Sequence, residues 1–141
     1  MWRQWMALNA ELLATLNREM QADAGLSNPD FQVLVVLTET AEGRIRITEL
    51  AKSLQWERSR VSHHVARMEK RDLVSRLGCP DDGRGAFVRI TEAGRAAIEQ
   101  TAPGHVRAVR HLVFDALTTE EVAQLDEIFH RLRSRVGLSA E

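Results

Sequence analysis

The chain has 141 residues, with 19 Lys and Arg against 20 Asp and Glu, which gives a formal net charge of −1. This length fits one domain with a hydrophobic core of its own. The sequence shows no apolar run long enough to span a membrane and no N-terminal signal-peptide pattern, and its one cysteine cannot form an intramolecular disulfide. We therefore expect a cytoplasmic protein.

Charge is distributed unevenly along the chain. Residues 44–95 hold 12 Lys and Arg against 7 Asp and Glu, a net charge of +5, whereas the other residues hold 7 against 13, a net charge of −6. A basic segment within an acidic chain is typical of a protein that presents one basic face to a nucleic acid. Its affinity for DNA is expected to fall with salt, because phosphate contacts release counterions.

Two helices and a short strand are expected before residue 48. The second helix begins at Asn28-Pro29, with Pro29 at the first helical position, where its missing N–H is tolerated. It continues to about residue 40, and a strand at 44–47 follows. The first helix spans about residues 2–20, with apolar residues at helical spacing: Trp5, Leu8, Leu12, Leu16 and Met20. The inward-facing residues of the second helix are Phe31, Leu34, Val35 and Thr38.

Residues 48–90 follow one another as a short helix, a tight turn, a second helix and a β-hairpin, the order of a winged helix-turn-helix. The Thr48 hydroxyl is expected to cap the first of these helices. Gln55-Trp56 interrupts the pattern, and Glu57 starts the next helix, where a carboxylate favours the positive end of the helix dipole. The apolar stripe of that second helix is Val61, Val65, Met68 and Leu73.

The opposite face of this second helix fits the major groove of duplex DNA, which is about 12 Å wide. It consists of small polar and cationic side chains: Ser59, Arg60, Ser62, His63, Ala66, Arg67 and Lys70. Those expected to face the bases are Ser59, Arg60, Ser62 and His63. Arg60 is the candidate for bidentate recognition of guanine. Those expected to contact phosphates are Arg58, Arg67 and Lys70.

The hairpin is predicted from alternating apolar and polar residues at 73–77 and 86–90. Two glycines flank Arg84 in the connecting loop, and Asp82 can pair with Arg84 across Gly83. An arginine held in one direction at a loop tip suits the narrow, negative minor groove. Taken alone, the loop fits an ordinary solvated turn equally well, but the helix pair before it favours a DNA-binding wing.

The rest of the chain is expected to be helical, so the fold class is mainly α with a small β-hairpin wing. Thr91 caps a helix that runs through Ile98, and Pro103-Gly104 bends or restarts it. Residues 105–117 continue as a helix. Thr118 and Glu121 form a capping box for the last helix. The apolar face of the last helix is Val122, Leu125, Ile128, Phe129 and Leu132.

These motifs resemble the MarR family of bacterial transcriptional regulators over nearly the whole chain. The most specific match is Asp82-Gly83-Arg84, which fits the D-x-R wing motif of the family. Asp72 departs from the family, which usually has glycine there, but aspartate tolerates the left-handed backbone that this position would need. The other matching segments are PDFQVL at 29–34, TELA at 48–51, SRVS at 59–62, MEKRDLV at 68–74 and ITEAG at 90–94.

The resemblance implies one domain (1–141) with a winged helix-turn-helix at about 28–103 and dimerisation helices at about 1–27 and 104–141. It also implies a homodimer on a pseudo-palindromic operator, with half-sites about 34 Å apart, and it favours repression. MarR-like proteins commonly lose DNA affinity when a small, often aromatic, ligand binds between the dimer helices and the DNA-binding region. Residues that could line such a cleft, or else serve only core and dimer packing, are Trp5, Met6, Asn9, Leu13, Phe31 and Val35.

Other functions stay open at this point. Cys79 in the wing loop could make the regulator redox-responsive. Nearby arginines would favour the reactive thiolate form of Cys79, whereas nearby aspartates would oppose it. A winged helix can also act only as a protein-docking module, which would leave the cluster of arginines unexplained. Catalysis is disfavoured, because Asp126 and His130 lack further metal ligands at suitable spacing and no nucleophile or phosphate-loop motif occurs. We expect neither a cofactor nor a metal ion.

Overall fold

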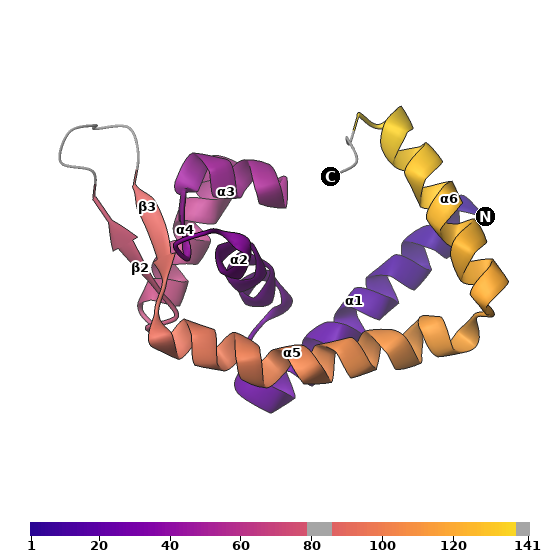
Figure 1. The fold of residues 1–141 in the computed structure, drawn as a ribbon, viewed down its shortest axis with the longest axis horizontal. Coiled ribbons are helices and arrows are strands. Elements are labelled where there is room, and N and C mark those ends of the chain that lie inside the picture. Colours follow the sequence, from indigo (N-terminus) through magenta and orange to yellow (C-terminus); the bar gives the residue numbers. More distant parts are fainter. Residues whose placement is uncertain (79–85, 138–141) are drawn as a thin grey trace. The chain divides into compact units, whose positions relative to one another are not determined.

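Residues 1–78 and 86–137 are described by a computed structural model of the chain, drawn in Figure 1. The chain divides into two compact units, Met1–His105 and Val106–Glu141. No helix within the described ranges is both long and apolar enough to cross a membrane. The elements are α1 (Trp2–Ala24), α2 (Asn28–Glu39), β1 (Arg44–Arg46), α3 (Ile47–Leu54), α4 (Arg58–Glu69), β2 (Val74–Leu77), β3 (Phe87–Ile90), α5 (Glu92–Leu112), the short 3-10 helix η1 (Phe114–Ala116) and α6 (Thr119–Arg135).

The core of the first unit lies where α2, α3 and α4 pack together and against the small sheet (Figure 1). Val61, Val65 and Met68 of α4 are fully buried, as predicted for its apolar stripe, whereas Leu73, the fourth predicted member, is buried but lies after the helix has ended at Glu69. Each such side chain contributes about 1.5–3 kcal/mol of favourable transfer free energy. Because three of them lie on one side of α4, the rotation of α4 about its axis is fixed. Other fully buried residues are Val33, Leu34, Leu37, Leu50, Val74 and Val88.

Helix α2 begins at Asn28, so Pro29 is its second residue, whereas the sequence predicted that Pro29 would be the first. A capping box that was not predicted sets this start. The Ser27 hydroxyl accepts a hydrogen bond from the Asp30 N–H at 3.2 Å, and the Asp30 carboxylate accepts one from the Ser27 N–H at 2.9 Å. The reciprocal bonds make Ser27 the N-cap and place the Asp30 carboxylate under the start of the helix.

The predicted inner faces of α1 and α2 are only partly confirmed. Leu16 and Met20 of α1 are buried, but Trp5 and Leu8 are 44% and 68% exposed. Only the C-terminal half of α1 therefore joins the core. On α2, Thr38 is exposed instead of facing inward, because the buried Leu37 directly before it already defines the inner face.

Thr48 does not cap α3, contrary to prediction, because α3 begins at Ile47 and Thr48 is already its second residue. The Ile47 N–H donates to the Ala86 carbonyl at 3.1 Å, immediately after the paired residues of β1 and β3. The chain thus enters the helix directly from the sheet. Arg46 takes the N-cap position without a side-chain hydrogen bond to the helix.

The sheet is antiparallel in the order β1-β3-β2. Arg89 of β3 lies opposite Arg44 of β1 and Ser75 of β2. Alternation along β3 buries Val88 and Ile90 and leaves Arg89 exposed. The structure thus confirms the predicted short first strand and both hairpin strands. Three wing residues that were given predicted roles lie outside the described ranges: Cys79, Asp82 and Arg84.

The chain reverses between α4 and β2 at Asp72, whose φ of 57° confirms the expected left-handed backbone. Thr91 ties this turn to α5: its hydroxyl donates to the Asp72 carbonyl, and its N–H donates to the Leu73 carbonyl at 3.3 Å. The same hydroxyl accepts from the Gly94 N–H at 3.0 Å, which confirms Thr91 as the cap of α5. Gly94 has no room for a side chain, because a Cβ would lie 2.0 Å from the Leu73 oxygen.

Helix α5 runs through Pro103 without a restart, which was one of the two outcomes, a bend or a restart, that the sequence predicted there. The φ angle of proline is compatible with a helix, and its missing N–H removes one hydrogen bond. The buried Thr101 remains in the helix, with its hydroxyl donating to the Ala97 carbonyl at 2.8 Å. The helix ends at Leu112, before the predicted end at about residue 117, and η1 follows.

The second unit is organised by the predicted capping box of α6. The Thr118 hydroxyl accepts from the Glu121 N–H at 3.2 Å, and the Glu121 carboxylate accepts from the Thr118 N–H at 2.8 Å. The apolar face of α6 is largely open: Ile128, Phe129 and Leu132 are exposed. This amphipathic helix therefore has apolar area that the described residues of the second unit do not cover.

We expect Asp72→Gly to raise the free energy of unfolding by about 0.5–1 kcal/mol, because glycine adopts a positive φ without the steric cost of a Cβ. Asp72→Ala should lower it by a similar amount, since alanine has the Cβ but lacks the polar side chain that makes this backbone tolerable. Urea denaturation of the three proteins measures both changes. Equal stability of the alanine and glycine variants would show that the backbone at this turn is unstrained.

Candidate nucleic-acid interface

Helix α4 presents one long polar face to solvent. Between Glu57 and Glu69 its sequence contains three arginines and no acidic residue. The exposed side chains are Arg58, Ser59, Arg60, His63 and Arg67, followed after the helix by Lys70. Ser62 is half-buried. All the residues predicted to meet DNA from this helix thus lie outside the core, opposite the buried stripe.

Arg60 is not extended freely from α4. Its guanidinium carbon lies 4.1 Å from the centre of the Trp56 ring, a cation–π contact. Trp56 belongs to the turn between α3 and α4, where its N–H donates to the Ala51 carbonyl at 2.9 Å. Gln55 before it has a φ of 54°, which allows this tight turn. The turn therefore supplies an aromatic surface on which the predicted base-contacting arginine rests.

Arg67 is held from the protein side by His64. An Nη atom of Arg67 lies 2.9 Å from His64 Nδ1, and His64 is 6% exposed. The other imidazole nitrogen, Nε2, lies 3.0 Å from Asp30 Oδ1. The buried histidine thus lies between a carboxylate of α2 and an exposed arginine of α4.

Asp30 is the buried centre of this group. Arg71 Nη1 donates to its Oδ2 at 2.7 Å, while Arg71 Nη2 donates to the Gly25 carbonyl at 2.7 Å. Burial by itself would raise the pKa of Asp30, but the contacts with His64, the Ser27 N–H and Arg71 outweigh it and hold the pKa well below its ordinary value. The carboxylate is therefore ionised and joins the α1–α2 turn to the end of α4. A polar cavity of about 460 Å³ beside it is lined by Gln21, Gly25, Ser27, Asp30, His64, Arg67 and Arg71.

The sequence predictions missed this network, because none of its members was given a role in it: Asp30, Trp56, His64 and Arg71. The pattern Ser27-x-x-Asp30 before an apolar run would have indicated a capping box. Nothing local in the sequence indicates the other contacts, because Asp30 and Arg71 are 41 residues apart.

The base of the wing is fastened to α4 by a second ion pair. Glu69 accepts from the Arg76 N–H at 2.9 Å and from its Nε at 2.7 Å. These bonds, first that of the backbone N–H, lower the pKa of Glu69. On the sheet, the guanidinium carbons of Arg44 and Arg46 lie 5.6 and 4.8 Å from the centre of the Phe87 ring. Cationic groups thus lie on β1 and β2, the two outer strands of the sheet.

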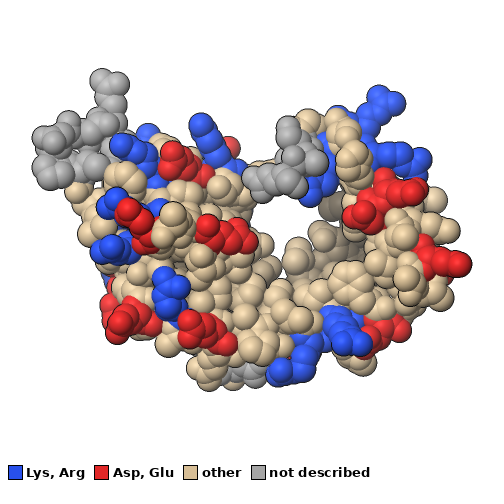
Figure 2. Space-filling view, viewed as in Figure 1, with Lys and Arg blue, Asp and Glu red and all other residues tan. Residues whose placement is uncertain are grey.

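Charges on the rest of the surface are mixed. Figure 2 shows Lys and Arg interspersed with Asp and Glu over the visible face of both units. Some of these charges pair directly, as Arg44 does with Glu42 at 2.6 Å. The concentration of cations without acidic neighbours in α4 is therefore a local property and does not reflect a basic protein.

The residues predicted to line a ligand cleft differ in burial. Phe31 of α2 is buried, and its ring centre lies 4.6 Å from that of His105, whose pKa is lowered by burial. Val35 is half-buried. Those on α1 are exposed: Trp5, Met6, Asn9 and Leu13. Within the described ranges, no group of three or more His, Cys, Asp or Glu side chains could hold a metal ion.

Helix α4 packs one face into the core and exposes the other; the short helix α3 precedes it and the antiparallel hairpin β2–β3 follows it. This arrangement is a winged helix-turn-helix. Residues 24–85 match the model of the MarR family. Among solved structures, Sco3205 of Streptomyces coelicolor, a MarR family regulator crystallised with DNA, is 43% identical, with a TM-score of 0.89 over 99% of this chain and 86% of that one. AbsC of the same organism, also a MarR family regulator, is 33% identical, with a TM-score of 0.89 over 98% and 93%.

A curated relative agrees with these structures. The transcriptional repressor YetL of Bacillus subtilis is 30% identical over 115 residues, which cover 79% of this chain and 68% of that protein. The chain belongs to the MarR family of transcriptional regulators.

Removing the Asp30 carboxylate should destabilise the fold in a pH-dependent way. At neutral pH we expect Asp30→Ala to lower the free energy of unfolding by about 2 kcal/mol, because Arg71, His64 and the Ser27 N–H lose the buried carboxylate that they contact. The folded pKa lies below the ordinary 3.8, so the carboxylate stabilises the fold above about pH 4, and this contribution is lost as the pH falls further. The difference from wild type should therefore shrink on acidification.

Urea denaturation between pH 7 and pH 2 measures this difference. Asp126→Ala is the matched control: the exposed Asp126 should change stability by less than about 0.5 kcal/mol. An Asp30→Ala protein whose deficit stays constant down to pH 2 would show that the carboxylate is not paired in the folded state.

Proposed function

We propose that this MarR-family regulator is a cytoplasmic repressor that binds a pseudo-palindromic operator as a homodimer and is released by a small, often aromatic, ligand. The observation that supports it best is the exposed face of α4, which is cationic, backed by the core and adjacent to the hairpin. The structures and the repressor that the chain resembles support the same function. We propose a single domain in which residues 28–103 bind DNA and residues 1–27 and 104–141 form the dimer.

Within this proposal α4 enters the major groove and the wing reaches the minor groove. Arg60 recognises a guanine through two hydrogen bonds, and Arg84, oriented by Asp82, enters the minor groove. The remaining base-facing residues are Ser59, Ser62 and His63. The phosphate contacts are Arg58, Arg67 and Lys70.

The test is fluorescence-anisotropy binding to the duplex directly upstream of this protein's own gene, at several salt concentrations, with a scrambled duplex as control. We expect tighter binding to the native duplex and a loss of affinity as salt increases. Equal and weak binding to both duplexes, unchanged by Arg60→Ala, would indicate an operator elsewhere or a winged helix that docks protein.

Two arginine variants separate base recognition from general affinity. Arg60→Ala should cost about 1–3 kcal/mol on the native duplex and relax the preference at one base position. Arg84→Ala should weaken binding to every duplex by a similar factor, because minor-groove shape is shared by many sequences. Anisotropy on a set of single-base variants of the operator measures both effects. Undiminished binding by Arg84→Ala at physiological salt would remove the wing from the interface.

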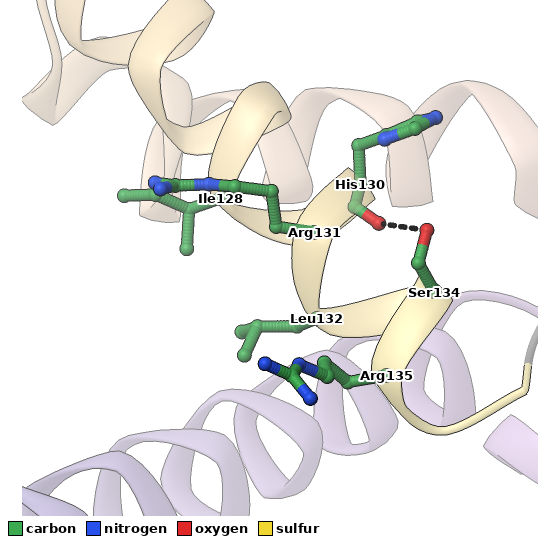
Figure 3. A pocket seen from close by; sticks show the side chains of 6 residues that line it. All are labelled: Ile128, His130, Arg131, Leu132, Ser134 and Arg135. Carbon is green, nitrogen blue, oxygen red and sulfur yellow. Dashed lines mark hydrogen bonds between the residues drawn. The ribbon is translucent and has the colours of Figure 1, made fainter.

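The proposal of a homodimer rests on apolar area that the chain leaves open at both ends. Trp5 and Leu8 of α1 are exposed, as are Ile128, Phe129 and Leu132 of α6. Figure 3 shows Ile128 and Leu132 on one side of α6, together with Arg131 and Arg135, whereas His130 and Ser134 lie on the other. A shallow pocket of about 530 Å³ is lined by these six residues of α6. A second copy of the chain would cover such a face.

Leu132→Glu should convert the dimer to a monomer at micromolar concentration, because a carboxylate would replace apolar contact at the dimer interface. Leu132 is 49% exposed within one chain, so the monomer fold should persist. His130→Glu, on the opposite side of α6, is the matched control and should remain dimeric. Light scattering coupled to gel filtration gives the masses. A wild-type protein with the mass of one chain would contradict the dimer.

The proposed ligand site uses residues at the open end of α1 and on α2. Aromatic and apolar side chains favour a planar ligand, and binding there would shift the population toward dimers whose recognition helices are wrongly spaced. The residues are Trp5, Met6, Asn9, Leu13, Phe31 and Val35.

A further inference from the structure

We infer that His64 is a positioning residue for DNA binding: from the buried side of α4 it orients Arg67 directly and Arg60 through Trp56. The inference rests on the proposed function, because it assigns how two of the DNA-facing side chains are prepared for binding. It makes the Asp30 carboxylate of α2, which contacts His64 and is not itself an expected DNA contact, part of the recognition apparatus.

The first step concerns the protons on His64. A guanidinium can only donate hydrogen bonds, so the contact of 2.9 Å between Arg67 and Nδ1 requires Nδ1 to be the acceptor. A neutral imidazole then has its proton on Nε2, which lies 3.0 Å from Asp30 Oδ1 in an electrostatic contact that lacks the alignment of a hydrogen bond. The ionised Asp30 favours a proton at that nitrogen and so leaves Nδ1 open for Arg67.

The second step is the position of His64 in the sequence of α4. Arg60, His64 and Arg67 are spaced i, i+4 and i+7, so they lie in one row along the helix. Both arginines are exposed, while the histidine between them is buried. The His64 ring can therefore contact both Arg67 and the Trp56 ring on which Arg60 lies.

The link to Arg60 passes through an aromatic pair. The rings of His64 and Trp56 meet edge to face, with centres 5.6 Å apart and planes at 89°. The Trp56 ring also contacts Arg60, whose guanidinium carbon lies 4.1 Å from the ring centre. If the imidazole is removed, the indole loses the contact that sets its plane, and Arg60 loses a fixed surface.

The consequence for binding is entropic. A long arginine side chain that is already confined loses less rotamer freedom when it meets a phosphate or a base. The network thus increases affinity without itself touching DNA. Such an effect should disappear when the arginine that it acts through is absent.

Two conservative variants divide the functions of the imidazole. His64→Asn retains an amide oxygen near the position of Nδ1, which can accept from Arg67. His64→Gln retains an amide nitrogen near the position of Nε2, which can donate to Asp30 but offers Arg67 no acceptor at the right place. His111→Gln, at an exposed histidine of the second unit, is the control.

Binding is measured by anisotropy on a mixed-sequence duplex of about 30 base pairs, in the wild-type background and in an Arg60→Ala/Arg67→Ala background that lacks both arginines, with unfolding midpoints recorded in parallel. We expect His64→Gln to weaken binding about tenfold in the wild-type background and by less than about twofold in the background without the two arginines. His64→Asn should bind within about threefold of wild type, and the control should be unchanged. A structural role alone would produce the same loss in both backgrounds, and that result would overturn the inference.

A measurement without DNA keeps the inference apart from the proposed function. The ¹⁵N chemical shifts of the His64 ring, assigned by comparison with His64→Asn, report which nitrogen has the proton. We expect it on Nε2 in the wild-type protein. A proton on Nδ1 would overturn the inference even if DNA binds tightly. Failure of the wild type to bind any duplex, with the proton on Nε2, would instead overturn the proposed function.

Discussion

The buried carboxylate of Asp30 is the constraint on which the packing of α4 in the first unit depends. A charge removed from water needs close partners, and here they come from the end of α4, from the α2 cap and from a histidine inside α4. Because Arg71 also donates to the Gly25 carbonyl, the same group closes the α1–α2 turn. One ionised oxygen pair therefore fixes the relation between α2 and the recognition helix.

This polar attachment complements the apolar one. Val61, Val65 and Met68 fix one side of α4 in the core, but apolar contacts are not directional and tolerate small rotations. The contact between His64 and Asp30 restrains the rotation of α4 at a second position, beside the apolar stripe. A buried ion pair gives little net stability compared with an apolar core. Its value here lies in the orientation of the remaining face, the one with arginines.

The two ends of the chain follow a different logic. α1 buries its C-terminal half in the first unit, and α6 is ordered by its own capping box, yet both leave apolar side chains open. Helices of this kind gain most of their stability from tertiary packing, so a second chain is the natural cover. A dimer would also supply the second recognition helix that a pseudo-palindrome requires. The exposed apolar ends and the single helix α4 of one chain are thus both consistent with the proposed dimer.

The sequence by itself determined what local patterns encode: the buried stripe of α4, the hairpin strands and the α6 cap. The exposed residues of α4 followed from the same periodicity, whereas the family and the left-handed Asp72 followed from the resemblance of the motifs. Tertiary structure decided the start of α3, since sheet pairing brings Ile47 to the Ala86 carbonyl. It also decided the partners of Asp30, because Arg71 is 41 residues away and only the packing of α4 on α2 brings their charges together.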